Sequence, residues 1–296
     1  MKTLTPQSEF YLETINKYKK EGKAIAHFNI SNLDQARAIV EVAQELNQPV
    51  IIGASEGESQ YMGIDMVRTI VDELNQEYEI PVFLNADHTY TLEKVQEVVQ
   101  AGYDSVIVDG AKLPYEENVA LVKSCVDFVR SYEEKTGKKV LVEAELGYIG
   151  QGSSLNSALP EGVTEANLTT PEQAKDFVLR TGIDMFAPAI GNVHGMLINA
   201  EEPKLRIDRL EEIRKVIDVP MVLHGASGNT DEDLIASIDA GVSVVHINTE
   251  IRKAFRDGEM HYLAEHPNEV APYKFGHEGQ EEMKKVVRAK MSLYMK

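Results

Sequence analysis

The amino-acid sequence predicts an α/β protein that folds as one (β/α)8 barrel, also called a TIM barrel. Short β-branched runs alternate with amphipathic segments of helical period from near the start of the chain to near its end. This alternation predicts parallel βα units. A length of 296 residues suits one barrel, because such barrels often exceed about 250 residues as a single domain. No Gly/Ser linker or shift in composition divides the chain, so we expect one domain over residues 1–296.

Eight apolar runs are the expected strands of the barrel. They are Ala24–Phe28, Val50–Gly53, Val82–Asn85, Ser105–Val108, Val140–Ala144, Met185–Ile190, Met221–Leu223 and Val242–Ile247. The expected helices include Leu33–Leu46, Thr91–Ala101, Tyr115–Tyr132, Thr170–Thr181, Ile207–Ile217 and Asp231–Ala240. Asn32 and Thr230 precede two of these helices as N-cap candidates, while Gly102, Gly182 and Gly241 mark helix ends that lead into strands.

Composition and charge narrow the range of functions. A hydrophobic fraction of 43% and a charged fraction of 26% are typical of a folded globular protein rather than a disordered one. The formal charge of −18 argues against a nucleic-acid or anionic-membrane surface, because either partner requires a basic face. An anionic substrate would therefore depend on local groups such as a metal ion or helix N-termini.

Targeting signals and cysteine content indicate the compartment. Residues Met1 to Tyr11 lack an apolar targeting segment, and no later run reaches about 18 apolar residues, so we expect a cytoplasmic protein. Cys125 is the only cysteine, which excludes an internal disulfide and a multi-cysteine zinc site. Its neighbours form a helical pattern and favour a buried, unreactive thiol.

Polar side chains of the kind that bind metals and substrates follow the expected strands. They are His27, Asn29, Ser55, Asp87, His88, Asp109, Glu143, Glu145, His194, His224, His246, Asn248 and Thr249. In a barrel, the C-terminal ends of all eight strands meet at one face, where the active sites of this fold are built. The sequence therefore predicts one active site to which every strand contributes.

Three of these histidines are the expected metal ligands. His88, His194 and His224 lie beside small residues in the segments NADHT, GNVHG and LHGASG, which permit close approach by an ion. Three neutral imidazoles leave an open position on zinc, as in catalytic zinc sites. For the histidines of the polar C-terminal region, His261, His266 and His277, ordinary hydrogen-bonding roles are expected.

The turn after the seventh expected strand is a candidate phosphate site. The segment Gly225 to Gly228 is rich in small residues and directly precedes a helix start, so it can present backbone N–H groups to an anion. The alternative is a simple tight turn. Its position favours the phosphate site, because the loops after strands seven and eight commonly form that site in barrels.

These segments and the residues around them resemble those of a known family, the class II fructose-bisphosphate and tagatose-bisphosphate aldolases. The resemblance covers nearly the whole chain in seven ordered blocks: HFNISNLDQARAIV, IIGASEGE, LNADHTYTLEKV, DSVIVDGAKLPYEEN, VEAELGYIG, AIGNVHG and VLHGASG. It implies cleavage of a ketose 1,6-bisphosphate, with fructose 1,6-bisphosphate expected first, to dihydroxyacetone phosphate and an aldehyde such as glyceraldehyde 3-phosphate. It also implies a homodimer or larger assembly.

The resemblance assigns roles to individual residues. It implies a zinc ion held by His88, His194 and His224, Asp87 as the acid/base that serves the C4 hydroxyl, and Asp109 and Glu145 as ligands of a second or alternative metal position. The substrate contacts expected from it and from the strand ends are Asn29, Ser55, Gly195, Gly225, Ala226, Ser227, His246, Ile247, Asn248 and Thr249.

The sequence also departs from the family pattern. The acidic pair that usually follows the fifth strand is replaced by Ser153 and Ser154, so the loop acid that moves the C3 proton is missing from its usual place. Glu161 is expected to take over this role, with Glu165 in reserve, because both lie in an irregular segment, residues 147–167, expected to be a mobile lid. Ala226, Val244 and His246 are further departures, and they bear on the choice of sugar.

Three other readings compete with the metal-dependent aldolase. A Schiff-base aldolase needs a lysine inside a strand, and none of the expected strands contains one. A metal hydrolase of the amidohydrolase type would need a His-x-His pair where His27-Phe28-Asn29 stands. A non-catalytic sugar-phosphate binder would fit the loss of the acid at Ser153. Fructose and tagatose bisphosphates differ at C4 alone and are both kept as candidate substrates.

Overall fold

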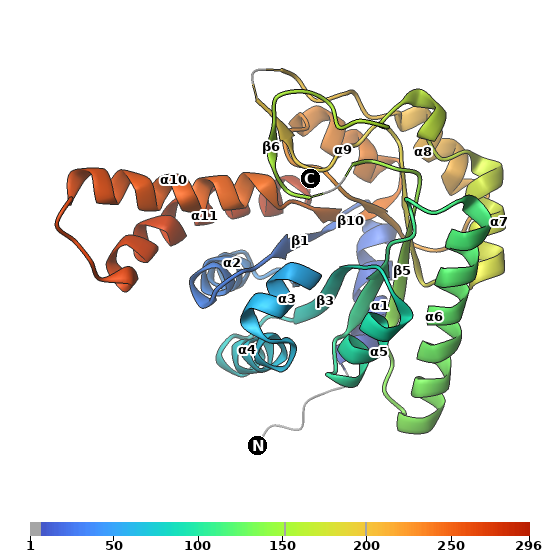
Figure 1. Cartoon of the computed structure of the whole chain (residues 1–296), viewed down its shortest axis with the longest axis horizontal. Coiled ribbons are helices and arrows are strands. Elements are labelled where there is room, and N and C mark those ends of the chain that lie inside the picture. The colour runs from blue at the N-terminus through green and yellow to red at the C-terminus, as the bar shows by residue number, and fades with distance from the viewer. Residues whose placement is uncertain (1–6, 151, 199) are drawn as a thin grey trace.

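The barrel predicted from the sequence is present in the structure, a computed structural model that describes residues 7–150, 152–198 and 200–296. Its eight parallel strands are β1 (Ile25–Asn29), β2 (Val50–Ser55), β3 (Val82–Thr89), β4 (Ser105–Val108), β5 (Leu141–Leu146), β7 (Met185–Pro188), β9 (Met221–Leu223) and β10 (Val242–His246). They close in the order β1-β10-β9-β7-β5-β4-β3-β2. Helices surround the strands on the outside (Figure 1). The single-domain (β/α)8 fold is thus confirmed.

The predicted helices lie where the amphipathic patterns placed them. They are α2 (Leu33–Leu46), α5 (Leu92–Gln100), α6 (Tyr115–Thr136), α7 (Pro171–Thr181), α8 (Ile207–Arg214) and α9 (Asp231–Asp239). The side chains of Asn32 and Thr230 accept hydrogen bonds from backbone N–H groups of the first helical turns, as expected of N-caps. Gly182 ends α7 with a left-handed backbone, the usual reason for glycine at this point.

A helix at the N-terminus closes the bottom of the barrel. Helix α1 (Gln7–Glu21) packs Tyr11 and Ile15 against buried residues that point into the barrel from the strands. The Tyr11 ring stacks on Phe83 of β3 with ring centroids 4.3 Å apart. The opposite end of the barrel, where the strands end, is left for the polar side chains.

Two further parts of the fold were not predicted. Helices α3 (Glu56–Met62) and α4 (Ile64–Glu77) both follow β2, and helices α10 (Thr249–Glu265) and α11 (Pro272–Leu293) form a hairpin that projects from the barrel (Figure 1). Helix α11 packs on α10 and on α2. The two arms approach closely at Gly258, where an added Cβ would lie 2.6 Å from the carbonyl oxygen of Glu278.

A short ribbon crosses above the ends of β5 and β7. Strands β6 (Leu155–Asn156) and β8 (Met196–Leu197) pair in parallel, and they join the segment after β5 to the loop that carries His194. Two-residue strands have no detectable sequence period, so the sequence does not predict them. Cys125 is buried in α6, as expected, and among the described helices none is long and apolar enough to span a bilayer.

Candidate active site

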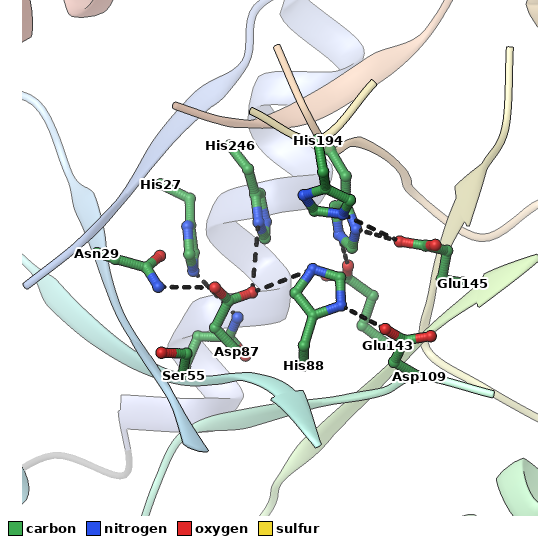
Figure 2. Close-up of polar contacts among 12 residues, drawn as sticks. His27, Asn29, Ser55, Asp87, His88, Asp109, Glu143, Glu145, His194 and His246 are labelled. Carbon is green, nitrogen blue, oxygen red and sulfur yellow. Dashed lines mark hydrogen bonds and ion pairs between the residues drawn. The ribbon is translucent and has the colours of Figure 1, made fainter. Parts of the chain in front are cut away.

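The polar side chains at the strand ends converge on one pocket (Figure 2). Twelve of the expected site residues line it, namely Asn29, Ser55, Asp87, His88, Asp109, His194, Gly195, Gly225, Ser227, His246, Asn248 and Thr249. Tyr90, Gly150, Gly152, Ser153 and Arg252 complete the described lining. Ala226 and Ile247, also expected as substrate contacts, are fully buried behind it, with their N–H groups bonded to the carbonyl oxygens of His246 and His27.

The three expected metal ligands lie together. His88, His194, His224 and Glu145 each offer a ligand atom, and these atoms all lie within 4.8 Å of one another. The His88 ring is 4.8 Å from the His194 ring and 5.0 Å from the His224 ring, centroid to centroid. Three imidazoles and a carboxylate are donors that zinc and related divalent ions accept.

His88 is held in a fixed orientation by its backbone and by Asp109. Its φ is +46°, a left-handed value that is uncommon for a residue other than glycine and often marks a functional site. The ring Nδ1 lies 2.8 Å from the Asp109 carboxylate, so a proton on Nδ1 leaves the Nε2 lone pair free to bind a metal. In the structure, Asp109 thus contacts a ligand residue.

His224 is held between two carboxylates of β5. Its Nε2 lies 2.6 Å from Glu143 and its Nδ1 lies 2.8 Å from Glu145, and all three side chains are buried. Burial opposes protonation of the ring, but the two carboxylates outweigh it and raise the pKa of His224 well above its usual value. With the Nε2 proton fixed by Glu143, Nδ1 is the atom that would bind a metal in place of its contact with Glu145.

Glu145 is the shared acidic member of this cluster. Its carboxylate lies 2.8 Å from Nδ1 of His224 and 3.8 Å from Nε2 of His194. Burial alone would raise the pKa of Glu145, yet the hydrogen bond with His224 and the closeness of His194 lower it below its usual value. The carboxylate is therefore ionised and can join the histidines in holding a divalent cation, so the residues present fit such an ion.

Asp87 lies at the centre of the site, between the histidine cluster and the neighbouring strand ends (Figure 2). One carboxylate oxygen, Oδ2, accepts a 2.7 Å hydrogen bond from Asn29. The other, Oδ1, lies 3.7 Å from Nε2 of His88 and 4.0 Å from Nδ1 of His246, with no hydrogen-bond partner among the described residues. Burial opposes ionisation, but His88, His27 and Asn29 together lower the pKa of Asp87 to about 2.

His246 stacks on His27 in the wall of the pocket. The two residues are partners in the β1–β10 register, and their rings are parallel, with centroids 3.6 Å apart. Burial lowers the pKa of His246 well below its usual value and lowers that of His27 to about 4, so both imidazoles are neutral. His27 lies at a strand end in the sequence, but its stacking on His246 depends on the register of the first and last strands and was not foreseen.

The expected phosphate loop is present, and part of its hydrogen-bonding capacity is used internally. The N–H of Gly228 donates to Glu250, and the N–H groups of Asn248 and Glu250 donate to the Ser227 hydroxyl oxygen. Gly225 has a φ of +57°, and an added Cβ would lie 2.4 Å from the carbonyl oxygen of Val193. Glycine is needed here because the loops after β7 and β9 touch.

The candidate lid covers one side of the pocket without its expected acid. Gly150, Gly152 and Ser153 line the pocket, whereas Glu161 is exposed and lies outside the described lining. Glu165 is also exposed and pairs with Arg206 at 3.7 Å. Gln151, within the predicted lid, lies outside the described residues. In this conformation, neither candidate for the missing acid faces the histidine cluster.

Arg252 lines the pocket and is held by Glu58, which lies outside the lining, and neither residue was expected in the site from the sequence. Arg252 lies in the first turns of α10, and Glu58 is the third residue of α3, where it forms a capping box with Ser55. The S-x-x-E spacing of this box is visible in the sequence. The contact between Arg252 and Glu58, however, joins residues 194 positions apart and is set by the closed barrel.

Comparison with known proteins agrees with this geometry. The family model of class II fructose-bisphosphate aldolase matches residues 10–296. The chain is 29% identical to the YdjI aldolase of Escherichia coli K12, with 96% of each chain covered and a TM-score of 0.79. It is 27% identical to a Coccidioides immitis protein assigned as a fructose-1,6-bisphosphate aldolase, with 96% and 95% covered and a TM-score of 0.80.

A third structure, the fructose-bisphosphate aldolase of Campylobacter jejuni, shares the fold at a TM-score of 0.78, with 22% identity and 97% and 94% of the two chains covered. The family is one of metal-dependent carbon–carbon lyases, and the buried histidine and glutamate cluster could hold the metal ion. The aldolase expectation drawn from the sequence is therefore confirmed at the level of the family. The chain belongs to the class II fructose-bisphosphate aldolase family.

Proposed function

We propose that this chain is a zinc-dependent aldolase that reversibly cleaves a ketose phosphate between C3 and C4. The products are dihydroxyacetone phosphate and an aldehyde. The observation that carries the proposal is the cluster of three histidines and Glu145, which reaches the pocket through His88 and His194 and adjoins Asp87 there. A pure binding protein would not require a carboxylate with an unpartnered oxygen 3.7 Å from a candidate ligand atom.

His88, His194 and His224 are the proposed ligands, with Glu145 and Asp109 available for a second or alternative position. A divalent ion held by these residues would supply Lewis-acid stabilisation of the negative charge that develops on the substrate during cleavage. Asp109 and Glu143 orient His88 and His224 through the hydrogen bonds described above. The protein thus supplies both the ligands and the groups that fix their protonation.

Asp87 is the proposed acid/base at the C4 hydroxyl. Its ionised carboxylate can accept the hydroxyl proton as the C3–C4 bond breaks and return it during condensation. Asn29 holds one carboxylate oxygen, which leaves Oδ1 directed to the substrate. The C1 phosphate is proposed to lie against Gly195, Gly225, Ser227, Asn248 and Thr249, which line the side of the pocket formed by the loops after β7, β9 and β10.

Glu161 is proposed to exchange the C3 proton after a movement of residues 147–167. In the structure it is exposed, so the role requires the lid to carry it toward the pocket. Ser153, which lines the pocket, cannot replace a carboxylate as the proton carrier. Glu165 stays the reserve candidate.

A coupled assay for triose phosphate across a panel of ketose phosphates tests the proposed function. Fructose 1,6-bisphosphate, expected from the family resemblance, and tagatose 1,6-bisphosphate are the reference substrates. Turnover should be abolished by a strong chelator and restored by zinc or cobalt. Covalent trapping of substrate by borohydride would instead show a Schiff-base mechanism. If no ketose phosphate turns over in the presence of excess metal, the chain is a sugar-phosphate binder.

A further inference from the structure

One wall of the pocket lies beside Asp87, where β1 and β2 end and α10 begins. We call it the acceptor wall and define it by Asn29 of β1, Ser55 of β2 and Arg252 of α10, which line the pocket, together with Glu58 of α3, which lies outside the lining and contacts all three. Asn29 contacts Asp87 directly, at 2.7 Å. Because Asp87 serves the C4 hydroxyl, the part of the substrate from C4 onward lies against this wall.

Glu58 is the shared hydrogen-bond acceptor of the acceptor wall. One of its carboxylate oxygens accepts from Asn29 at 2.8 Å and from both the backbone N–H and the hydroxyl of Ser55, at 2.9 and 2.8 Å. The other oxygen accepts from Ser31 at 3.1 Å and from Arg252. The second N–H of the Asn29 amide is given to Asp87, so this amide has no donor left.

These contacts also cancel the positive charge of the wall. Arg252 is the single lysine or arginine among the described residues that line the pocket. It pairs with Glu58, whose side chain is 8% exposed, and the carboxylate of Asp87 contacts Asn29 of the same wall. A phosphate placed here would meet no uncompensated cation. Drawing Arg252 away from Glu58 would leave a buried carboxylate without its charge partner, which is unfavourable.

We propose that the acceptor wall selects an uncharged aldehyde, so that the substrate is a ketose 1-phosphate with a free hydroxyl at its far end rather than a ketose bisphosphate. This inference rests on the proposed aldolase function. Cleavage breaks the C3–C4 bond, the C4 hydroxyl proton leaves with the acid/base, and C3 gains one proton. Dihydroxyacetone phosphate and an unphosphorylated polyhydroxy aldehyde together contain all the atoms of the substrate.

The test compares two aldehydes that differ only by a phosphate. Condensation of dihydroxyacetone phosphate with glyceraldehyde or with glyceraldehyde 3-phosphate is followed by consumption of dihydroxyacetone phosphate on the zinc-loaded protein. We expect kcat/KM to favour glyceraldehyde by at least about tenfold, because like charges placed close together are disfavoured. A preference for glyceraldehyde 3-phosphate would overturn the inference and leave the aldolase function standing. Absence of condensation with any aldehyde would overturn both.

Glu58→Gln isolates the charge, because it keeps the size of the side chain. We expect it to shift the kcat/KM ratio toward glyceraldehyde 3-phosphate by about tenfold or more, through a lower KM for this aldehyde and an unchanged KM for dihydroxyacetone phosphate. Glu45→Gln is the matched control, since Glu45 pairs with Arg288 at 2.6 Å on an exposed surface away from the pocket. An unchanged ratio in a folded Glu58→Gln protein with normal metal content would remove Glu58 as the determinant.

Discussion

Asp109 and Glu143 each contact one nitrogen of a proposed metal ligand, so that the other nitrogen is the one that would bind the ion. Asp109 does so for His88 and Glu143 for His224, at 2.8 and 2.6 Å. Such partners fix the ring orientation and the position of the proton, and their loss typically weakens metal binding by about 10- to 100-fold. The affinity of the site for its ion therefore depends on residues that need not touch the ion.

Glu143→Gln is expected to lower zinc affinity by about 10- to 100-fold, because a neutral amide stabilises the Nε2 proton of His224 less than a carboxylate does. Competition with a chromophoric chelator measures this affinity directly. His224→Ala should lower the metal content further, together with the rate, while His277→Ala should change neither. Equal metal content in the His224 and His277 variants would contradict the ligand assignment.

Asp87→Asn separates proton transfer from metal binding. The variant should retain its metal, whereas kcat should fall by about 10²- to 10⁴-fold, as for the loss of a general acid/base. Metal analysis and steady-state kinetics on the same sample provide the two readouts. If the metal is lost along with activity, Asp87 acts as a ligand or as the support of one.

The sequence predicted the positions of the polar residues better than their contacts. His88, His194 and His224 could be found because each follows a recognisable strand, and the closed barrel brings strand ends together. The stacking of His27 on His246 and the pairing of Glu58 with Arg252 could not be found, because they depend on strand register and on a helix that the sequence pattern did not reveal.

Among the secondary-structure elements, the segment 147–167 has the largest untested role. It is joined to the His194 loop by the pairing of β6 with β8, and the N–H of His194 donates to the carbonyl oxygen of Ile149. A movement of the lid would thus act on the loop that carries a proposed metal ligand. Lid position and ligand position are linked through backbone hydrogen bonds.

Glu161→Gln is expected to lower kcat by about 10²- to 10⁴-fold with unchanged metal content, if the lid brings this carboxylate to C3. Exchange of the C3 proton of dihydroxyacetone phosphate with solvent should slow by a similar factor, since this half-reaction does not need Asp87. Glu165→Gln is the matched comparison. Losses below about threefold in both assays would return Glu161 to the role of a solvent-exposed loop residue.

The helices α10 and α11 of the projecting hairpin were not predicted from the sequence because their helical pattern is weak. Both helices contain glycines, at Gly258, Gly276 and Gly279, which weaken a helical signal because glycine is a poor helix former. These glycines allow the two helices to pack closely, since added Cβ atoms at Gly258 and Gly279 would lie 2.6 and 3.0 Å from atoms of the opposing helix. Strands, in contrast, were found because short apolar runs suffice to mark them.

Gly258→Ala is therefore expected to destabilise the protein by about 1–3 kcal/mol, because the overpacking outweighs the gain in helix propensity. Gly57→Ala is the control, since Gly57 is helical and an added Cβ there would have no atom within 4 Å. The control should be neutral or stabilising by up to about 1 kcal/mol. Chemical denaturation of both variants gives the comparison, and equal stabilities would show that the hairpin yields to accommodate the methyl group.

In the whole molecule, the projecting hairpin is a part that leaves large apolar side chains exposed within a single copy of the chain. Its residues Met260, Val270 and Tyr273 are 61%, 85% and 75% exposed. Exposed apolar side chains on a projecting arm are typical of contacts between copies. We propose that these side chains form the contact in the homodimer or larger assembly expected from the family resemblance.

Light scattering at micromolar concentration is expected to give at least twice the chain mass. Val270→Asp combined with Tyr273→Asp should shift the protein toward the monomer, because two charges would enter the proposed contact. The variant must keep its thermal stability for this shift to be interpreted. A monomer mass for the wild-type protein would contradict the predicted assembly.

The closed strand order has a consequence for how the specificity of this enzyme can be changed. Glu143, Asp109 and the candidate metal ligands come from β3, β4 and β5 and from the loops after β7 and β9, whereas the acceptor wall comes from β1, β2 and the helix after β10, which are neighbours on the remaining arc of the barrel. The proposed metal site and the acceptor wall thus lie on different arcs of the barrel and are linked by the hydrogen bond from Asn29 to Asp87. A library restricted to the second arc should yield aldolases for new aldehydes without loss of the ion, and homologous barrels should exchange this arc as a unit.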